Sequence, residues 1–533
     1  MRKTLFAITL MLISVLAQAQ VPRILWWFDT DDSSFGQSAL DDIDQDGKYE
    51  VVFGCYRNDS MIYALNAEDG SLLWKFNASG AGEGCNDVAI LIYDVTGDDI
   101  PDVIVPSSCN PKTFCFRGHD GFIQWQTNTR GSDSPPVVVD IDKDGNLEIL
   151  HGEFQGWVRC MDGLTGVTKW ELLVDANSWV QTAPTIADVD QDGQLDFVVA
   201  TWGFNNNSRL YAYDGATRAL HWSIPMDDYV YHGTGVADLD GDGKPELVVG
   251  DYSGKLHVLN AEDGTYAWSY NAGYYIGAPP AIGDINGDGQ CEVVITSYFK
   301  VIALTNQGGV LWQYNIPGNG QAFRGVALAD ITNDTIPEVI FGSSNGSVYA
   351  LNGFNGNSLW SVDLKAHIGV DFEIDHAPVI ADFNGDDTLD LFIVGGFTEY
   401  PNFQANYGRG YALAIGKGAG PEWKMFQRDY YRSCSQCYPG QIIGVEKSDP
   451  FPLKPQFSIH PVPVYKNGNL HIQSDTPGDY TVQVFDLSGK LLYTGRNVSV
   501  INTAQISLEA GMYLIRCQSS SGSSIKKFAV VTP

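Results

Sequence analysis

The stretch Asp238-Leu-Asp-Gly-Asp-Gly-Lys-Pro-Glu246-Leu-Val-Val-Gly250 contains the pattern on which most of this chain is built. Acidic residues stand at its positions 1, 3, 5 and 9, glycine stands at position 6, and a short apolar run follows. The pattern occurs eight times, at intervals of 46 to 52 residues. Its units begin at Asp42, Asp94, Asp140, Asp188, Asp238, Asp284, Asp330 and Asp382. A repeat of this period indicates one supersecondary unit that stacks on copies of itself.

Each unit has the composition of about four short strands, because its apolar runs are short and β-branched and carry no helical period. Glycine stands four positions before a tryptophan in six units, where a hairpin turn needs a positive φ. These tryptophans are Trp74, Trp125, Trp170, Trp222, Trp268, Trp312, Trp360 and Trp423. The sequence predicts an all-β protein: an eight-bladed β-propeller over residues 20–437, with seven blades as the alternative, and a small C-terminal β-sandwich.

The first residues have the features of an export signal. Arg2 and Lys3 precede an apolar run over residues 5–16, and Ala17-Gln-Ala19 offers a cleavage site. We therefore expect residues 1–19 to be removed. No later segment is apolar enough to predict a transmembrane span. Residues 24–28, Ile-Leu-Trp-Trp-Phe, are similar to the tryptophan-bearing last strand of a unit, and we expect them to complete the eighth blade.

The acidic turns predict calcium sites, because hard carboxylate oxygens at alternate positions of a tight turn suit Ca²⁺. An EF-hand would place its glutamate at position 12 and would be flanked by helices, which this pattern does not provide. Four units carry the full ligand set. These ligands are Asp42, Asp44, Asp46 and Glu50; Asp140, Asp142, Asp144 and Glu148; Asp188, Asp190, Asp192 and Asp196; and Asp238, Asp240, Asp242 and Glu246.

The other four units depart from the pattern, through a neutral residue at position 3 or through loss of the glycine. We expect the loops at Asp94 and Asp330, where threonine stands at position 3, to bind calcium most weakly. The candidate ligands in these units are Asp94, Asp98 and Asp102; Asp284, Asn286, Asp288 and Glu292; Asp330, Asp334 and Glu338; and Asp382, Asn384, Asp386 and Asp390.

The overall charge agrees with bound cations. The chain has 533 residues with 64 acidic and 32 basic side chains and a formal net charge of -32, and 28 of the acids stand at positions 1, 3, 5 and 9 of the eight loops. Such crowding is repulsive unless a cation intervenes, and it excludes a nucleic-acid ligand, which needs clustered cations. We expect several structural Ca²⁺ ions whose binding is coupled to folding.

The repeat resembles the FG-GAP (VCBS-type) propeller family, and its tryptophan and turn positions are similar to quinoprotein-like repeats. The resemblance covers roughly residues 21–437. It implies calcium-bound blades used in adhesion or ligand binding and, less often, a carbohydrate lyase or a dehydrogenase.

A different composition begins after a proline-rich connector at residues 438–456. Residues 457–533 contain alternating strand patterns at 480–490, 511–516 and 527–530. They resemble the type A C-terminal sorting domain of the Bacteroidota type IX secretion system. This resemblance implies that the secretion machinery is a partner and that the protein is secreted or held at the cell surface.

The loops that lead into the first strand of each unit are the candidate ligand site. They lie opposite the acid loops, since a strand crosses its sheet, and they are rich in aromatic side chains that suit stacking on sugar rings or gripping a peptide. Packing between blades is the equally weighted alternative. The candidate ligand-binding residues are Trp179, Tyr231, His232, Tyr275, Phe323, Arg324 and His376.

Catalytic motifs are weak in this chain. Gly342-Ser-Ser-Asn-Gly346 matches a nucleophile elbow, but a strand follows it where that motif needs a helix. We therefore predict a non-catalytic surface adhesin, or a module that binds an extracellular glycan or protein, and we designate no catalytic residue. The alternative is a polysaccharide lyase or a quinoprotein-type dehydrogenase, in which His232, His376 or Arg324 would be the candidate base.

The chain has nine cysteines, and the export signal predicts an oxidising compartment for them. Because nine is an odd number, at least one cysteine stays outside any intrachain disulfide. Cys109 and Cys115 are close in sequence, as are Cys434 and Cys437, but spacing leaves the connectivity open. For the Cys434-Ser-Gln-Cys437 motif we favour a structural role over a redox role.

Overall fold

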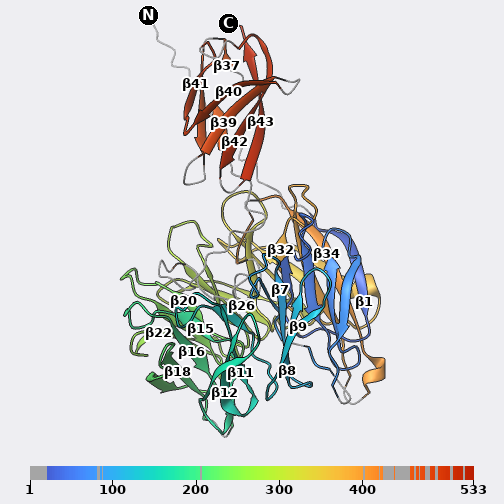
Figure 1. Cartoon of the computed structure of the whole chain (residues 1–533), viewed down its shortest axis with the longest axis vertical. Coiled ribbons are helices and arrows are strands. Elements are labelled where there is room, and N and C mark those ends of the chain that lie inside the picture. The colour runs from blue at the N-terminus through green and yellow to red at the C-terminus, as the bar shows by residue number, and fades with distance from the viewer. Residues whose placement is uncertain are drawn as a thin grey trace, which may run out of the picture. The chain divides into compact units, whose positions relative to one another are not determined.

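A computed structural model describes residues 21–423 apart from 81–83, 87, 205–206, 400–401 and 419, residue 437, and residues 457–532 apart from 461–463, 467, 475–479, 487–489, 505–507 and 520–521. The expected signal peptide and the proline-rich connector lie outside these residues. The chain divides into two compact units, Met1–Val445 and Glu446–Pro533 (Figure 1).

The first unit contains eight antiparallel sheets, named sheets 1 to 8; sheets 1 to 6 each form from one sequence repeat, and sheets 7 and 8 also include a strand from elsewhere in the chain. Sheet 1 comprises β2 (Ala39–Asp41), β3 (Glu50–Gly54), β4 (Met61–Asn66) and β5 (Leu72–Asn77). Sheet 2 comprises β6 (Leu91–Tyr93), β7 (Asp102–Ser107), β8 (Lys112–Arg117) and β9 (Ile123–Asn128). Sheet 3 comprises β10 (Val137–Val139), β11 (Glu148–Glu153), β12 (Trp157–Asp162) and β13 (Thr168–Leu173). Sheet 4 comprises β15 (Thr185–Ala187), β16 (Asp196–Ala200), β18 (Arg209–Asp214) and β19 (Leu220–Pro225).

The remaining sheets repeat this order. Sheet 5 comprises β20 (Gly235–Ala237), β21 (Glu246–Gly250), β22 (Lys255–Asn260) and β23 (Tyr266–Asn271). Sheet 6 comprises β24 (Ala281–Gly283), β25 (Glu292–Ser297), β26 (Lys300–Leu304) and β27 (Val310–Asn315). Sheet 7 comprises β28 (Ala327–Asp330), β29 (Glu338–Gly342), β30 (Ser347–Leu351), β31 (Ser358–Asp363) and the later strand β35 (Gly420–Trp423). Sheet 8 comprises β32 (Val379–Ala381), β33 (Leu389–Phe397), β34 (Tyr407–Gly416) and the N-terminal strand β1 (Arg23–Thr30).

Little else is regular in the described part of this unit. A short pair, β14 (Ser178–Trp179) and β17 (Trp202–Gly203), lies outside the eight sheets. Helices are limited to α1 (Leu364–Ile368) and to 3-10 turns at Phe154–Gly156, Pro317–Asn319 and Phe403–Ala405.

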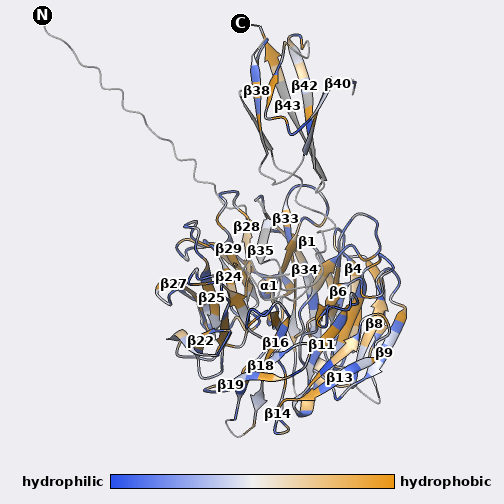
Figure 2. Cartoon of the chain, turned by 60° about the vertical axis from the view of Figure 1, so that its left-hand side comes forward, coloured by the Kyte–Doolittle hydropathy of each residue, from blue (hydrophilic) through white to orange (hydrophobic). Residues whose placement is uncertain are grey.

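The core lies between neighbouring sheets, because the second and third strands of each are apolar on both faces. In one cluster, Val52 and Ile62 of sheet 1 pack with Ile92 and Phe114 of sheet 2. In Figure 2, which colours the ribbon by hydropathy, hydrophobic residues lie mainly in the strands and hydrophilic residues mainly in the connections between them. Burial on both faces explains why these strands are continuous β-branched runs instead of alternating ones.

In six of the eight sheets the last, outer strand is anchored to the next sheet by a hydrogen bond from its tryptophan, whereas Trp360 Nε1 has no hydrogen-bond partner among the described residues. The Trp26 indole N–H donates to the Ala67 carbonyl at 2.8 Å, and that of Trp125 donates to the Gly163 carbonyl at 2.9 Å. The ring lies on the glycine of the next hairpin: a Cβ added at Gly70 would meet the Trp26 ring at 2.5 Å. The glycine therefore supplies both a positive φ and room for the indole.

Strand β1 completes sheet 8, as the sequence of residues 24–28 predicts. It pairs antiparallel with β34, and its Trp26 docks on the turn of sheet 1. The assignment of Trp423 as the eighth tryptophan is therefore wrong. Trp423 lies in β35, which pairs with the first strand of sheet 7, because the chain turns back after β34 instead of forming another outer strand.

Two disulfides join cysteines that are distant in sequence. Cys85 pairs with Cys109, and Cys291 pairs with Cys437. The close spacing of Cys109 and Cys115 does not produce a bond, because Cys115 lies buried inside β8 as a free thiol. The bond to Cys291 gives Cys437 a structural role, and Cys434 lies outside the described residues.

The second unit has two sheets in its described residues. One has the order β36 (Phe457–His460), β38 (Asn469–Ser474), β41 (Val500–Asn502). The other has the order β37 (Val464–Tyr465), β43 (Gly522–Val531), β42 (Gly511–Ser519), β39 (Tyr480–Asp486), β40 (Leu491–Arg496). Their shared core includes Leu470, Val484 and Ile515, so the predicted alternation of residues 480–490 is realised in β39.

Candidate functional site

The acid loops connect the first and second strands of all eight sheets, and the carboxylate at position 1 organises each loop. Asp42 Oδ2 accepts the N–H of Gly47 at 3.1 Å, and Asp238 Oδ2 accepts that of Gly243 at 3.0 Å. The position-6 residue has a positive φ even where it is not glycine, as at Asp99 (φ 66°). A departure from glycine thus adds strain without changing the course of the loop.

The acid at position 9 begins the second strand and is buried. One of its oxygens accepts the position-2 N–H in every loop, for example Ile43 to Glu50 at 2.9 Å. The other oxygen has no hydrogen-bond partner among the described residues in sheets 1, 2 and 8, where the acids are Glu50, Asp102 and Asp390. A buried carboxylate oxygen without a donor is costly unless a cation approaches it.

Burial changes the ionisation of these acids. It raises the pKa of Glu50 to about 9, with a further increase from nearby Asp44, and it raises the pKa of Asp102 and Asp390 to about 7. Without a cation, a large share of these carboxyls would hold a proton at neutral pH. Cation binding must therefore displace protons from the loops.

The candidate ligands converge as a metal site requires. In sheet 1, one oxygen from each of Asp42, Asp44 and Glu50 lies within 4.8 Å of the others. The same holds for the position-1, position-3 and position-9 acids of sheets 3 and 4. The position-5 acids also stabilise the end of the loop: Asp46 Oδ1 accepts a hydrogen bond from the Lys48 N–H at 2.9 Å. An all-oxygen set of this kind fits Ca²⁺.

An additional basic side chain lies over two of the loops, and the sequence pattern did not predict it. In sheet 3, Lys169 Nζ lies 2.8 Å from Asp142, 3.1 Å from Asp144 and 2.7 Å from Glu148. In sheet 4, the equivalent residue is His221, whose Nε2 lies 3.1 Å from Asp196 Oδ1. The outer strand supplies both residues.

The opposite side of sheets 4 to 7 carries a continuous group of aromatic rings, here called the aromatic band. Two of its pairs are parallel stacks: Trp202 with Tyr229, with centroids 4.3 Å apart, and Tyr252 with Tyr275 at 5.1 Å. None of the nine rings is fully buried. The band comprises Trp202, Tyr229, Tyr231, Tyr252, Tyr274, Tyr275, Tyr298, Phe299 and Phe323.

The leading loops contribute only part of this band. Tyr231, Tyr275 and Phe323 are among the predicted residues that it includes, and Trp179 adjoins it because β14 pairs Trp179 with Trp202. Tyr229 and Tyr274 also come from the leading loops. The other four rings, Trp202, Tyr252, Tyr298 and Phe299, come from the connections between second and third strands. These turns lie on the same side as the leading loops by strand alternation, and that signal could have identified them.

Three predicted polar residues are buried. Arg324, 8 % exposed, contacts His232, 1 % exposed, and lies over the Tyr231 ring. Burial, with the Arg324 charge second, holds the pKa of His232 well below its ordinary value. His376 lies elsewhere, with Nε2 3.0 Å from both the amide nitrogen and the Oγ of Ser38. These side chains pack the structure and do not form an accessible acid-base group.

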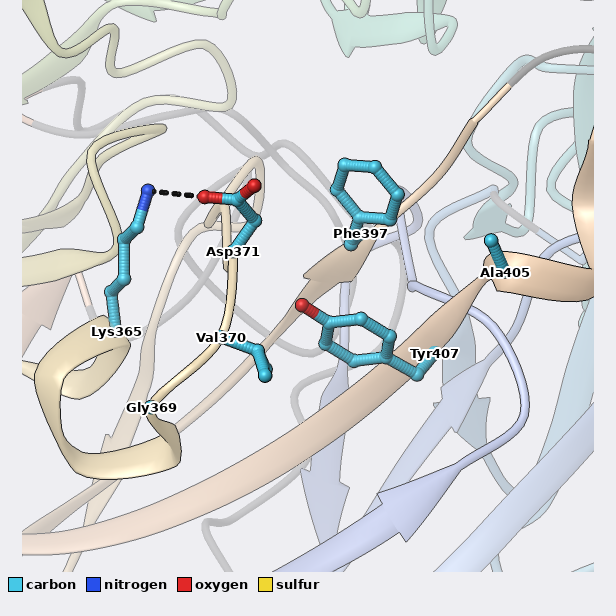
Figure 3. A pocket seen from close by; sticks show the side chains of 7 residues that line it. All are labelled: Lys365, Gly369, Val370, Asp371, Phe397, Ala405 and Tyr407. Carbon is cyan, nitrogen blue, oxygen red and sulfur yellow. Dashed lines mark ion pairs between the residues drawn. The ribbon is translucent and has the colours of Figure 1, made fainter.

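An open depression of about 540 Å³ lies beside the connection between β33 and β34 of sheet 8 (Figure 3). Phe397 and Tyr407 stack along one part of it, with centroids 5.9 Å apart, and Lys365 pairs with Asp371 at 2.8 Å on another. Both charges are already neutralised, so the depression offers a substrate no unpaired charged group among its described lining residues.

Different family models match the two units of the chain. Residues 206–423 match the family model for outer membrane protein assembly factor BamB, and residues 458–531 match the secretion system C-terminal sorting domain. The first match agrees with the quinoprotein-like spacing of tryptophan and glycine. The match over 458–531 corresponds to the predicted sorting segment.

One curated relative and two solved structures indicate the fold. Rhamnogalacturonan endolyase YesW of Bacillus subtilis (strain 168) is 23 % identical over 264 residues, 42 % of this chain and 39 % of the relative, so the chain spans about two fifths of its length. The V. cholerae biofilm matrix protein Bap1 has a TM-score of 0.53 and 16 % identity, with 74 % of this chain and 91 % of Bap1 covered. A europium-containing methanol dehydrogenase has a TM-score of 0.51 and 13 % identity, with 74 % and 93 % covered.

Neighbours this distant in sequence establish an all-β, propeller-like architecture and no activity. Every helix in the described residues is too short and polar to span a membrane. The chain is therefore an exported protein, with a propeller-like repeat unit and a secretion-system C-terminal sorting domain that directs it to the cell surface or beyond.

Proposed function

We propose that this protein is a non-catalytic, calcium-stabilised propeller that binds an extracellular glycan through its aromatic band. The band carries the proposal, because partly exposed rings in loops that the sheets hold in place present flat apolar faces that match the faces of sugar rings. Its most nearly parallel pair is Trp202 with Tyr229, whose ring planes differ by 2°. The sorting domain would present this surface outside the cell.

Eight blades closed into a ring would give the band its rigidity. Two observations support closure: β1 from the N-terminus completes sheet 8, and its Trp26 docks on Gly70 of sheet 1. The last sheet is therefore held to the first by the same contact that joins five other pairs of neighbouring sheets. Closure by radial repetition leaves only short edges exposed.

Calcium in the acid loops would stabilise the blades from the other side. The unpaired buried oxygens of Glu50, Asp102 and Asp390 support this role, as does the convergence of acids at positions 1, 3 and 9. Every described protein ligand comes from within its own blade, as expected for structural ions instead of substrate-binding ones.

The charge of the protein favours neutral glycans over polyuronates. The chain carries a formal charge of -32, and Lys255 beside the band is paired with Asp227 at 3.0 Å. Arg324 is buried beneath the rings. The net negative charge of the protein would therefore repel an acidic polymer.

The test is retention of neutral and uronic polysaccharides by the calcium-loaded protein, compared with a Trp202→Ala variant. We expect neutral glycans to be retained at unchanged chain length, and Trp202→Ala to weaken binding by at least about tenfold, or 1.4 kcal/mol. Phe122→Ala is the matched control, since this exposed ring stands on the acid-loop side. Equal loss in both variants, or no retention of any glycan, would count against the band.

A polysaccharide lyase remains the second candidate because a named endolyase is 23 % identical over part of the chain. The same incubation distinguishes it: a lyase shortens an acidic polymer and produces unsaturated ends that absorb ultraviolet light. Burial of His232 and His376 argues against these residues as the base.

A further inference from the structure

The outer strand of each sheet contains a β-bulge at the residue before its docking tryptophan. In sheet 3 the register shifts between Cys160 and Met161, which leaves Lys169 as the extra residue. In sheet 4 it shifts between Ala212 and Tyr213, which leaves His221. A bulge redirects a side chain out of the regular alternation. The bulge residues are Leu73, Gln124, Lys169, His221, Ala267, Leu311 and Leu359, with Leu25 in β1.

Lys169 demonstrates where a side chain from this bulge reaches. Its ammonium lies among three of the four predicted calcium ligands of sheet 3 and takes the oxygen of Glu148 that stays unpaired in sheets 1, 2 and 8. This loop has a cation of its own. The bulge position is therefore aimed at the cation position of the acid loop.

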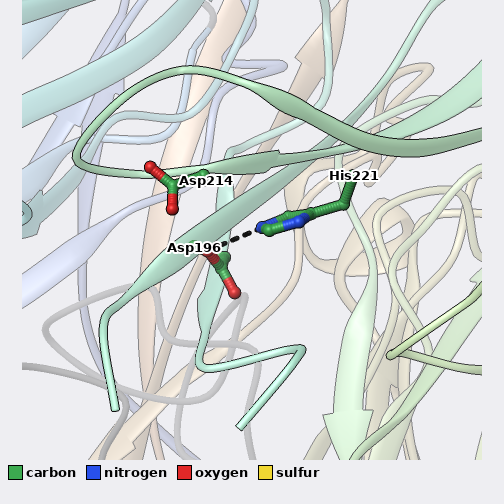
Figure 4. A group of neighbouring side chains, drawn as sticks. All are labelled: Asp196, Asp214 and His221. Carbon is green, nitrogen blue, oxygen red and sulfur yellow. Dashed lines mark hydrogen bonds and ion pairs between the residues drawn. The ribbon is translucent and has the colours of Figure 1, made fainter. Parts of the chain in front are cut away.

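His221 reaches the same place in sheet 4 (Figure 4). Its Nε2 lies 3.1 Å from Asp196 Oδ1, and its Nδ1 lies 3.8 Å from Asp190 Oδ2. One nitrogen of His221 and one oxygen each from Asp196 and Asp214 fall within 4.8 Å of one another. On the loop side, Asp188 Oδ1 is buried and has no hydrogen-bond partner among the described residues.

We propose that the acid loop of sheet 4 is a transition-metal site, in which His221 supplies an imidazole nitrogen beside the carboxylates of Asp196, Asp190 and Asp188. The inference rests on the cation-binding role proposed for the acid loops and assigns one of them a different class of ion. The ligand is a divalent metal such as Zn²⁺, Co²⁺ or Mn²⁺.

The donor atoms decide the class of metal. Calcium takes oxygen ligands almost exclusively, whereas one imidazole with carboxylates suits zinc and its first-row neighbours. Two ligands held about 2.1 Å from one ion lie about 3.0 to 3.4 Å apart, which includes the separation of His221 Nε2 from Asp196 Oδ1. No other bulge residue is a histidine, so one site of this kind is expected.

Cobalt(II) is the probe, because its visible absorption reports nitrogen ligation and coordination number independently of any activity. The purified full chain is titrated with Co²⁺ in excess Ca²⁺, and bound metal is counted after dialysis. We expect the wild type to retain one Co²⁺, and His221→Gln to bind it at least about tenfold more weakly while its calcium content stays the same.

Two further variants keep the test informative if His221→Gln is unstable. Ala267→His places imidazole in the bulge of sheet 5 above a full acid set and should add a second Co²⁺ site. His119→Gln removes an exposed histidine, 36 % exposed, and should change nothing. Cobalt that Ca²⁺ displaces completely, or that binds equally to His221→Gln, overturns the inference. Absence of calcium from all loops would instead refute the cation role in the proposed function.

Discussion

Replacing Lys169 with methionine tests whether the third acid loop contains its cation in the form of an ammonium group. Methionine keeps the length of the apolar stem and removes the charge that contacts Asp142, Asp144 and Glu148. Glu148 is fully buried and Lys169 is 24 % exposed. The substitution therefore leaves a buried carboxylate without its partner while the rest of the acid set remains.

The expected loss follows from that burial. Removing one partner of a buried ion pair costs about 3–5 kcal/mol, and partial exposure of Lys169 and the two aspartates lowers this to about 2–3 kcal/mol. Uptake of a proton limits the loss, because burial already raises the pKa of Glu148 to about 7. Calcium should restore stability, since the vacated loop matches that of sheet 1. Ca²⁺ at a free concentration 100 times its dissociation constant adds about 2.7 kcal/mol to the free energy of unfolding.

The assay combines urea unfolding with metal counting. In chelator, Lys169→Met should unfold at lower urea than the wild type; in excess Ca²⁺ the difference should nearly disappear, and one additional Ca²⁺ should be bound. Lys255→Met is the control, because it breaks a surface pair with Asp227 and should cost less than about 1 kcal/mol in both conditions. Equal calcium stoichiometry in Lys169→Met and wild type would refute the reasoning.

Three further predictions concern protonation and packing. Burial raises the pKa of Glu50 in the folded protein to about 9, against an ordinary value of 4.5, so without metal the folded state holds a proton that the unfolded state loses. The melting temperature of the chelated protein should therefore fall as the pH rises from about 5 to 9, and bound Ca²⁺ should remove this dependence. His232 has the opposite sign: its lowered pKa means that stability is lost as pH falls below 6.5, and His232→Gln should reduce that loss in acid melting curves. Gly121→Ala should lower the free energy of unfolding by about 2–4 kcal/mol, because φ is +66° and the new Cβ would meet the Trp74 ring at 2.7 Å. Gly318→Ala, with φ +67° and open space around the new Cβ, should cost only about 1 kcal/mol in the same urea assay. Equal costs for the two variants would exclude the packing argument.

Local signals predicted the repeat unit well because its features lie within a few residues of one another. The acidic turn, the β-branched run and the glycine before the tryptophan each specify one conformation, and eight repetitions strengthen the pattern. The docking partner of that tryptophan was not predictable, since Trp26 and Gly70 belong to different sheets.

The candidate sites show the same division. The carboxylates of each loop are neighbours in sequence, so their spacing predicted their convergence. Lys169 and His221 are 21 and 25 residues from the nearest acid that they contact, Glu148 and Asp196, and only the pairing of the outer strand and its bulge bring them over the loop. Sequence spacing also could not predict the disulfides, because the fold brings Cys437 next to Cys291, 146 residues earlier in the chain.

The sequence by itself determined the all-β repeat, the acid loops and the change to a sorting segment, because these depend on short-range patterns of charge, turn residues and alternation. The tertiary structure decided which side chains meet across strands and sheets: the contiguous aromatic band, the burial of Arg324 and His232, and the basic residue that lies above two of the acid loops. Such contacts depend on register and on stacking of sheets, which a single bulge changes without altering the local pattern.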